Sequence, residues 1–295
     1  MITARNISKA YNGTSALKDV SFTIERGKIF GVIGHNGAGK TTLLKILAGL
    51  VEPSAGELFF DGREVLYDAA WVRHLIGYLP EESRLYETMK VSEYLSFFGE
   101  IYGMDRQTIR ERSRSLLDWL ALEENGKKIG EFSKGMKRKA AIARSLIHDP
   151  SILIYDEATS GLDPMTSRHI VEFLKDLRKE GKTIVLSAHN LYQVEAICDT
   201  ILILRRGERV ALGSMAELRE MFGSITYSVV FSIRDPATLP GIAGLEADGG
   251  YFRVVASSIG EMNGITQEIV RAGGTVERVE SHYPTLEEML VKIGA

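Results

Sequence analysis

The apolar positions along residues 1–213 switch repeatedly between two patterns. Short apolar runs bounded by turn residues predict β-strands, and the segments with this pattern are Ile2–Ile7, Ala16–Ile24, Lys28–Gly34, Gly56–Phe60, Leu75–Leu79, Ile152–Tyr155, Thr183–Ser187, Thr200–Leu204 and Arg209–Leu212. Helical spacing of apolar residues predicts a short helix before Thr200, and longer ones over Lys40–Gly49, Val91–Leu120 (with a break at Gly103–Asp105), Gly135–Ile147 and Met165–Lys179. Strands that alternate with helices indicate an α/β domain with a largely parallel sheet.

A second, smaller unit is predicted after a boundary around Gly223-Ser224. We expect one domain over residues 1–222 and another over residues 224–295. The second segment reads as strand, strand, helix, strand and helix, in the order Ile225–Ile233, Tyr251–Ala256, Glu261–Arg271, Thr275–Val279 and Leu286–Lys292. This order indicates a small α+β domain.

The composition narrows the class of protein. Of the 295 residues, 44% are hydrophobic, and 36 basic residues nearly balance 39 acidic ones, which argues against disorder and against a protein that binds nucleic acid through its overall charge, while a local basic patch stays open. The single cysteine, Cys198, excludes an intramolecular disulfide and indicates a reducing compartment. No apolar run approaches the roughly 18–20 residues of a membrane helix, and the first residues lack the pattern of a signal peptide. We therefore expect a cytosolic protein, unless another component holds it at a membrane.

Residues Gly34–Thr41 match the phosphate-binding pattern G-x-x-x-x-G-K-[ST]. Glycines allow consecutive backbone N–H groups to curl around a phosphate, and the following helix presents its positive N-terminus to the same group. Lys40 is expected to reach the β- and γ-phosphate oxygens, and the Thr41 hydroxyl to bind Mg²⁺. A chance glycine-rich turn is disfavoured, because an apolar strand precedes the loop and a helix follows it. The segment therefore predicts nucleotide binding.

Two carboxylates follow the buried-type strand over Ile152–Tyr155. Because side chains alternate along a strand, Asp156 and Glu157 diverge and can take different roles. Asp156 suits a Mg²⁺ site and Glu157 suits a general base for an attacking water; a pair of exposed charges at a strand end is the structural alternative. His189, after the strand Thr183–Ser187, lies at the edge where α/β sheets bind ligands, although such a histidine alone is more often structural.

The order of these motifs resembles the nucleotide-binding subunit of an ATP-binding cassette (ABC) transporter, over residues 1–222. The matching segments are Walker A (Gly34–Thr41), a signature-like Phe132-Ser133-Lys134-Gly135-Met136, Walker B (Ile152–Asp156, with Glu157), a D-loop-like Ser160-Gly161-Leu162-Asp163, the switch histidine His189 and the adenine-stacking aromatic Tyr11. The resemblance implies an α/β P-loop NTPase cassette that has a mixed sheet core with antiparallel β and helical subdomains, followed by the small C-terminal α+β domain.

The resemblance also implies an ATPase mechanism with ATP and Mg²⁺ as cofactors. The implied catalytic residues are Lys40, Glu157, which activates water, and His189, which holds the γ-phosphate. The residues implied in nucleotide binding are Tyr11, Gly34, Asn36, Gly37, Ala38, Gly39, Lys40, Thr41, Thr42, Ser133, Lys134, Gly135 and Asp163. The implied Mg²⁺ ligands are Thr41, Glu81 and Asp156. Two cassettes are expected to pair head to tail, so that Ser133 and Gly135 meet the γ-phosphate held by the partner.

Several positions depart from the family pattern. Glu81 stands where the Q-loop has glutamine, so its side chain accepts hydrogen bonds but cannot donate them; a substitution within a subfamily is the favoured interpretation. Lys134 and Met136 replace a glycine and a glutamine of the signature. Two interpretations of Lys134 stay open, a cation near the phosphates or a solvent-facing side chain. Ala158 replaces a common proline, and no consequence follows from the residue types.

Two further features lie outside these motifs. A basic run between Lys127 and Arg144 could contact nucleic acid, but it lacks interleaved aromatic residues, so a solvated helix face is the expected explanation. The C-terminal segment, including Tyr283–Met289, resembles the accessory domain of ABC exporter ATPases of the drug, sodium or lipid-linked type. That resemblance implies dimer stabilisation or regulation, and a passive appendage is the alternative.

The sequence therefore predicts the ATP-hydrolysing subunit of an ABC exporter, peripheral at the cytoplasmic face of the cell membrane. Its expected partners are a separately encoded polytopic permease, which contacts residues 81–94, and an identical or paralogous ATPase subunit; no nucleic acid is expected. One alternative is a soluble ABC ATPase of translation or DNA maintenance, disfavoured because the chain has one cassette and no long heptad run. Another is a nucleotide-sensing module without hydrolysis, disfavoured by the presence of Glu157 and His189.

Overall fold

The computed structural model describes residues 1–65, 70–123, 125–188, 190–223, 225–234, 239 and 242–294. These residues form two compact units, Met1–Met215 and Ala216–Gly294, which are described separately. The domain limits predicted at residues 222 and 224 stay a prediction. Among the described residues, no helix combines the length and the apolar composition needed to cross a membrane.

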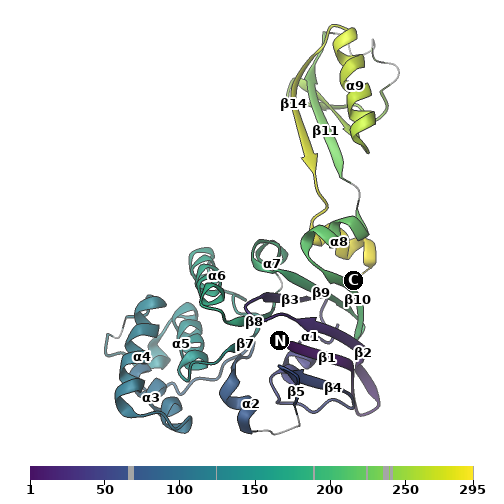
Figure 1. The fold of residues 1–295 in the computed structure, drawn as a ribbon. Coiled ribbons are helices and arrows are strands. Elements are labelled where there is room, and N and C mark those ends of the chain that lie inside the picture. The colour runs from purple at the N-terminus through teal and green to yellow at the C-terminus, as the bar shows by residue number, and fades with distance from the viewer. Residues whose placement is uncertain are drawn as a thin grey trace. The chain divides into compact units, whose positions relative to one another are not determined.

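A six-stranded sheet with the order β10-β9-β3-β8-β7-β6 is the centre of the first unit (Figure 1). Its strands are β3 (Ile29–Ile33), β6 (Ile76–Leu79), β7 (Ile152–Asp156), β8 (Thr183–Ser187), β9 (Thr200–Arg205) and β10 (Glu208–Gly213). All neighbouring pairs are parallel except β9–β10, so the predicted largely parallel sheet is confirmed. Every residue of β3, β7 and β8 is buried, which explains their continuous apolar runs. The carboxyl ends of these three adjacent strands meet at one edge.

A second, antiparallel sheet has the order β2-β1-β4-β5 and packs over the helix α1 (Lys40–Leu47). Its strands are β1 (Ile2–Tyr11), β2 (Thr14–Ile24), β4 (Ala55–Phe60) and β5 (Arg63–Glu64). Asn12 and Gly13 join β1 to β2 with φ values of 47° and 82°, the left-handed conformations of a two-residue hairpin turn. Leu43 and Leu44 of α1 are fully buried in one core with residues of both sheets. The core therefore fixes the start of α1 against both sheets.

Three helices on one side of the unit form a helical subdomain (Figure 1). These are α3 (Val91–Ile101), α4 (Arg106–Trp119) and α5 (Lys134–Leu146), which pack on one another. The predicted break before α4 is confirmed, because the Asp105 side chain accepts hydrogen bonds from the amides of Gln107 and Thr108. The remaining elements of this unit are α2 (Ala70–Leu75), the 3-10 helix η1 (Ile129–Glu131), α6 (Pro164–Lys179) and α7 (Leu191–Ile197).

His148 contacts both the helical subdomain and the central sheet, and its burial makes the free energy of unfolding depend on pH. Its Nε2 donates to the Ile76 carbonyl at 3.1 Å, its ring stacks on Tyr102 with 3.8 Å between centroids, and its buried Nδ1 has no hydrogen-bond partner among the described residues. Burial lowers the pKa of His148 from 6.5 to about 4. The folded protein therefore holds a neutral imidazole over a pH range in which the unfolded chain binds a proton.

Stability is expected to fall as the pH is lowered from about 6.5 towards 4, by up to about 3 kcal/mol from this group. The sign follows because the unfolded chain binds more protons than the folded protein in that window. Urea unfolding of the wild type and of His148→Gln, whose amide can still donate to Ile76, measures the difference at pH 7 and pH 5. A wild-type loss no larger than that of His148→Gln would contradict this assignment.

The second unit contains a four-stranded antiparallel sheet with the order β12-β13-β11-β14 and one helix packed on it. Its elements are α8 (Met215–Phe222), β11 (Thr226–Ser232), β12 (Glu246–Asp248), β13 (Tyr251–Ala256), α9 (Ile259–Arg271), β14 (Thr275–His282) and α10 (Leu286–Ile293). Ile269 of α9 is buried against Val229 and Phe231 of β11 and Val254 of β13. The predicted α+β character is confirmed, and α8 and β12 are additional elements.

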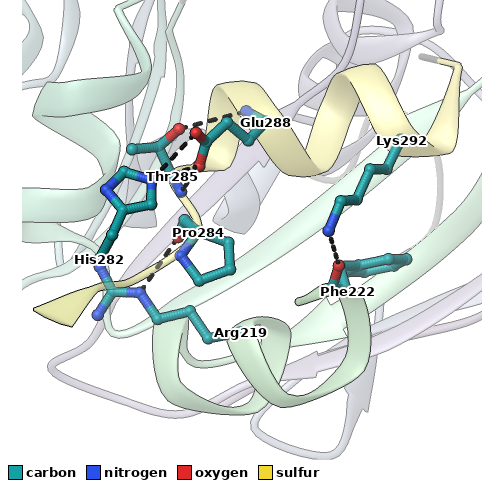
Figure 2. Close-up of polar contacts among 7 residues, drawn as sticks. All are labelled: Arg219, Phe222, His282, Pro284, Thr285, Glu288 and Lys292. Carbon is teal, nitrogen blue, oxygen red and sulfur yellow. Dashed lines mark hydrogen bonds and ion pairs between the residues drawn. The ribbon is translucent and has the colours of Figure 1, made fainter. Parts of the chain in front are cut away.

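The helices α8 and α10 are tied together at the ends of this sheet, as Figure 2 shows. Arg219 Nε donates to the Pro284 carbonyl at 3.4 Å, and Lys292 Nζ donates to the Phe222 carbonyl at 3.0 Å. Thr285 begins α10 with a capping box, because its hydroxyl accepts the Glu288 amide while Glu288 accepts the Thr285 amide. The chain segments before β11 and after β14 are therefore held side by side.

Candidate functional site

The phosphate-binding pattern lies between β3 and α1, as predicted. Lys40 Nζ donates to the carbonyls of Gly34 at 2.7 Å and His35 at 3.2 Å, so its side chain folds back over the loop, and the residue is only 7% exposed. Gly39 precedes α1 with a φ of 103°, and no side chain caps the helix. Its first turn also contains no acidic residue. The first-turn amides of α1 are therefore available to an anion.

The two carboxylates of the Walker B segment lie at the same edge of the sheet. Asp156 ends β7 and is 2% exposed, and Glu157 follows it at 5% exposed. Ser187 at the end of β8 donates its hydroxyl to Asp156 Oδ1, while the Glu157 amide donates to the carbonyl of Ser187 at 3.2 Å. The alternative of two exposed charges is thus wrong, since both carboxylates are buried. Ser187 was missed as a site residue; the only signal was its place at a buried strand end.

The carboxylates and the lysine share one electrostatic environment. Burial lowers the pKa of Lys40, and the negative charges of Glu157, Asp156 and Glu81 oppose that effect. Asp156 Oδ2 is buried and has no hydrogen-bond partner among the described residues. This open carboxylate oxygen and the hydroxyl of the exposed Thr41 are both of the ligand type that a small divalent cation prefers. The residues present therefore suit a Mg²⁺–nucleotide complex.

Further predicted nucleotide-binding residues of the first unit lie in β1, in the phosphate-binding loop and in α1. Tyr11, at the end of β1, is 43% exposed and carries Lys9 over its ring at 5.2 Å. The strand that contains Tyr11 pairs with β2, and β2 lies close to the phosphate-binding loop. A Cβ on Gly39 of the loop would be 2.5 Å from the Ala16 carbonyl oxygen of β2. The exposed Asn36 and Gly37 and the buried Ala38 complete the loop, and Thr42 in α1 is half-buried. His189 lies outside the described residues.

The signature-like residues make their described contacts at the starts of α5 and α6, away from the phosphate-binding loop. Ser133 caps α5 by accepting the Met136 amide, and Asp163 caps α6 by accepting the Thr166 amide at 2.9 Å. A Cβ on Gly135 would lie 3.2 Å from Thr166 Cγ2, so the two helix starts are closely packed. None of the contacts described for Ser133, Gly135 and Asp163 reaches the phosphate-binding loop of the same chain.

Of the two arrangements left open for Lys134, the structure shows an exposed side chain, and a cation near the phosphates of a partner stays a prediction. The Lys134 ammonium lies close to Gly161 of the D-loop. A Cβ at Gly161 would be 2.1 Å from Lys134 Nζ. Gly161 has a φ of 64°, so this turn favours glycine. The Lys134 charge is therefore held beside the D-loop of its own chain.

The expected solvated face of the basic run is wrong for two of its arginines. Arg138 is 8% exposed and donates to five backbone carbonyls. Arg144 is half-buried, donates to the Tyr78 carbonyl at 3.2 Å and lies 5.5 Å from the ring of Phe98. The pattern of charges along α5 could not reveal this, because the acceptors come from distant parts of the chain.

The loop on α1 and the carboxylates on β7 place the chain among the P-loop nucleotide-binding proteins. Residues 17–160 match the family model of the ABC transporter, and residues 213–293 match that of the ATP-binding protein DrrA1-3-like, C-terminal domain. The chain is 39% identical to the ABC transporter ATP-binding protein NatA of Bacillus subtilis (strain 168), over 78% of this chain and 96% of that protein. The chain therefore belongs to the ABC transporter ATP-binding proteins, which are ATPases that bind ATP.

Two further similarities bear on function. The chain is 36% identical to the Nod factor export ATP-binding protein I of Burkholderia lata, over 80% of this chain and 77% of that protein. A solved dimeric ATP-binding cassette, MJ0796 bound to ADP and Pi in a post-hydrolysis state, matches with a TM-score of 0.67 and 27% identity. That match covers 72% of this chain and 98% of that one. The predicted family and fold class are confirmed, and a non-transport ABC ATPase is not favoured.

Proposed function

We propose that this chain hydrolyses ATP at the edge formed by the phosphate-binding loop and the Asp156–Glu157 pair, and thereby drives export through separate transmembrane subunits. The observation that carries the proposal is the buried cluster of Lys40, Asp156 and Glu157, which combines a cation for phosphate oxygens with two differently placed carboxylates. The relative that bears the name of an export protein supports the direction of transport.

Each residue of the cluster has a distinct role in this proposal. The amides of Asn36, Gly37 and Gly39 and the first turn of α1 hold the phosphates, with Lys40 on the β/γ oxygens. Thr41 and Asp156, with Glu81 beside them, would hold Mg²⁺, which neutralises charge on the phosphates. Glu157 takes a proton from the attacking water. His189 would contact the γ-phosphate, and Tyr11 would stack on adenine.

The active form in this proposal is a head-to-tail dimer. Ser133, Lys134 and Gly135 at the start of α5 would face the nucleotide on the partner, with Asp163 at the same interface. The dimeric form of the similar cassette supports this arrangement. Closure by ATP follows if ATP binds the closed dimer more tightly than the open one. The second unit would stabilise the dimer or regulate it.

An aromatic cluster marks the proposed contact with the permease at the cytoplasmic face of the membrane. Tyr86, Tyr94, Phe97 and Phe98 lie with ring centroids 5.0–6.2 Å apart. Tyr86 and Phe97 are 49% and 38% exposed, although both are large apolar side chains. Exposed aromatic residues grouped on a buried base are typical of protein-binding surfaces. The cluster overlaps residues 81–94, where permease contact is predicted.

A photo-crosslinking amino acid in place of Tyr86 is expected to form an adduct with a multi-spanning membrane protein in cells. Leu50, which is 51% exposed and outside the aromatic cluster, is the matched control position and should give no such adduct. Mass spectrometry of the crosslinked band identifies the partner. Adducts only with ribosomal or DNA-repair proteins, or none with a membrane protein while ATPase activity persists, would contradict the transporter assignment.

A further inference from the structure

Arg138 occupies a position that the motifs do not assign. Its guanidinium has five N–H donors, and five backbone carbonyl oxygens accept from them. Nε donates to Ala158 at 2.9 Å, Nη1 to Pro80 at 2.7 Å and Glu81 at 3.0 Å, and Nη2 to Asp156 at 2.9 Å and Glu157 at 2.8 Å. One side chain of α5 thus joins the end of β6 to the end of β7.

This arrangement needs an arginine. Burial lowers the pKa of Arg138 to about 10, so it stays charged near pH 7. Among the described residues, Arg138 forms no ion pair with a carboxylate, and its hydrogen bonds go to backbone oxygens of two segments. A planar fork with donors in fixed directions can serve carbonyls on both segments at once, whereas a lysine ammonium is a single point with three donors.

The hydrogen bonds also act on the backbone of the proposed catalytic carboxylate. Glu157 has a φ of 53°, a left-handed conformation that costs a residue other than glycine roughly 1–2 kcal/mol. Nη2 of Arg138 donates to the carbonyls of Asp156 and Glu157, which are the backbone carbonyls immediately before and after the Glu157 Cα. On the other side, the Glu157 amide donates to Ser187. The backbone of Glu157, and with it the direction of its side chain, is therefore fixed by Arg138 and by Ser187. Arg138 also binds the carbonyls of Pro80 and Glu81.

We propose that Arg138 is a positioning residue that couples residues 80–81 to Glu157, so that permease contact at the neighbouring aromatic cluster changes the rate of hydrolysis. This inference rests on the proposed function, since it needs hydrolysis at Glu157 and a partner near Tyr86. When residues 80–81 move, the guanidinium moves with them, and the backbone of residues 156–158 follows. The phosphate-binding loop lies outside this link, because the described hydrogen bonds of Arg138 go to residues 80–81 and 156–158 and not to the loop.

The test compares Arg138→Lys and Arg138→Gln with the wild type in the assembled transporter and in the isolated chain. We expect kcat to fall roughly 100-fold, because a displacement of about 1 Å at a reacting group has this effect, while KM for ATP stays within about threefold. The ratio of permease-stimulated to basal activity is expected to fall towards one in Arg138→Lys. Arg112→Gln is the matched control, because Arg112 also donates to backbone carbonyls, those of Leu146 and Ile147, away from the site.

The outcomes separate this inference from a structural role and from the proposed function. Thermal unfolding and ATP binding in EDTA identify a variant that does not fold. The inference fails if folded Arg138→Lys has the kcat and the stimulation ratio of the wild type. It also fails if Arg112→Gln loses as much kcat and stimulation as the Arg138 variants. If the wild type shows no turnover, or Glu157→Gln turns over normally, the proposed function itself fails.

Discussion

Replacing Glu157 with glutamine is expected to lower kcat for ATP roughly 10²–10⁴-fold, because an amide cannot accept the proton of the attacking water. The substitution keeps the size of a side chain that is 5% exposed and leaves the backbone bonds to Arg138 and Ser187 in place. The affinity for ATP is expected to stay within about threefold of the wild type, since phosphate binding depends on the loop and on Lys40. Single-turnover hydrolysis and equilibrium ATP binding measure the two quantities separately.

Glu172→Gln is the matched control for this prediction. It makes the same chemical change on α6, where the carboxylate pairs with Lys175 at 2.9 Å on the surface, and it should leave kcat unchanged. With ATP bound, Glu157→Gln is also expected to persist as a dimer in size-exclusion chromatography, because reopening depends on hydrolysis. Turnover of Glu157→Gln within threefold of the wild type would remove Glu157 from the catalytic role.

The sheet and the nucleotide-binding segments could be predicted because they depend on short sequence patterns. Strands buried on both faces produce continuous apolar runs, and the phosphate-binding loop needs fixed spacing between Gly34, Gly39 and Lys40. Elements without a periodic signal were missed, among them the two-residue β5 and the three-residue β12. The helix α2 is also absent from the sequence-based prediction, and Leu75, the predicted start of a strand, is the last residue of this helix.

The parts of the site that depend on tertiary contacts could not be predicted. Arg138 belongs to a run of basic residues that is typical of a solvated helix face, yet its acceptors lie 18–58 positions away in the sequence. Lys134 lies over Gly161 because α5 and α6 begin side by side, which no local pattern shows. Ser187 contacts Asp156 and Glu157 only because β7 and β8 are neighbours in register. In each case, the contact depends on which helices and strands are neighbours in the fold, and the residue type alone does not show this.

Gly39→Ala is expected to weaken ATP binding about 100-fold and to lower the free energy of unfolding by roughly 1–3 kcal/mol. The φ of 103° is strained for alanine, and the new Cβ would lie 2.5 Å from the Ala16 carbonyl, so loop and strand must move apart. That movement displaces the amides that converge on the phosphates. Gly181→Ala is the control, because its φ is 88° with nothing within 4 Å, so stability should fall while ATP affinity is unchanged. Calorimetric ATP titration and urea unfolding measure both effects; wild-type affinity in Gly39→Ala would show that the loop tolerates displacement from β2.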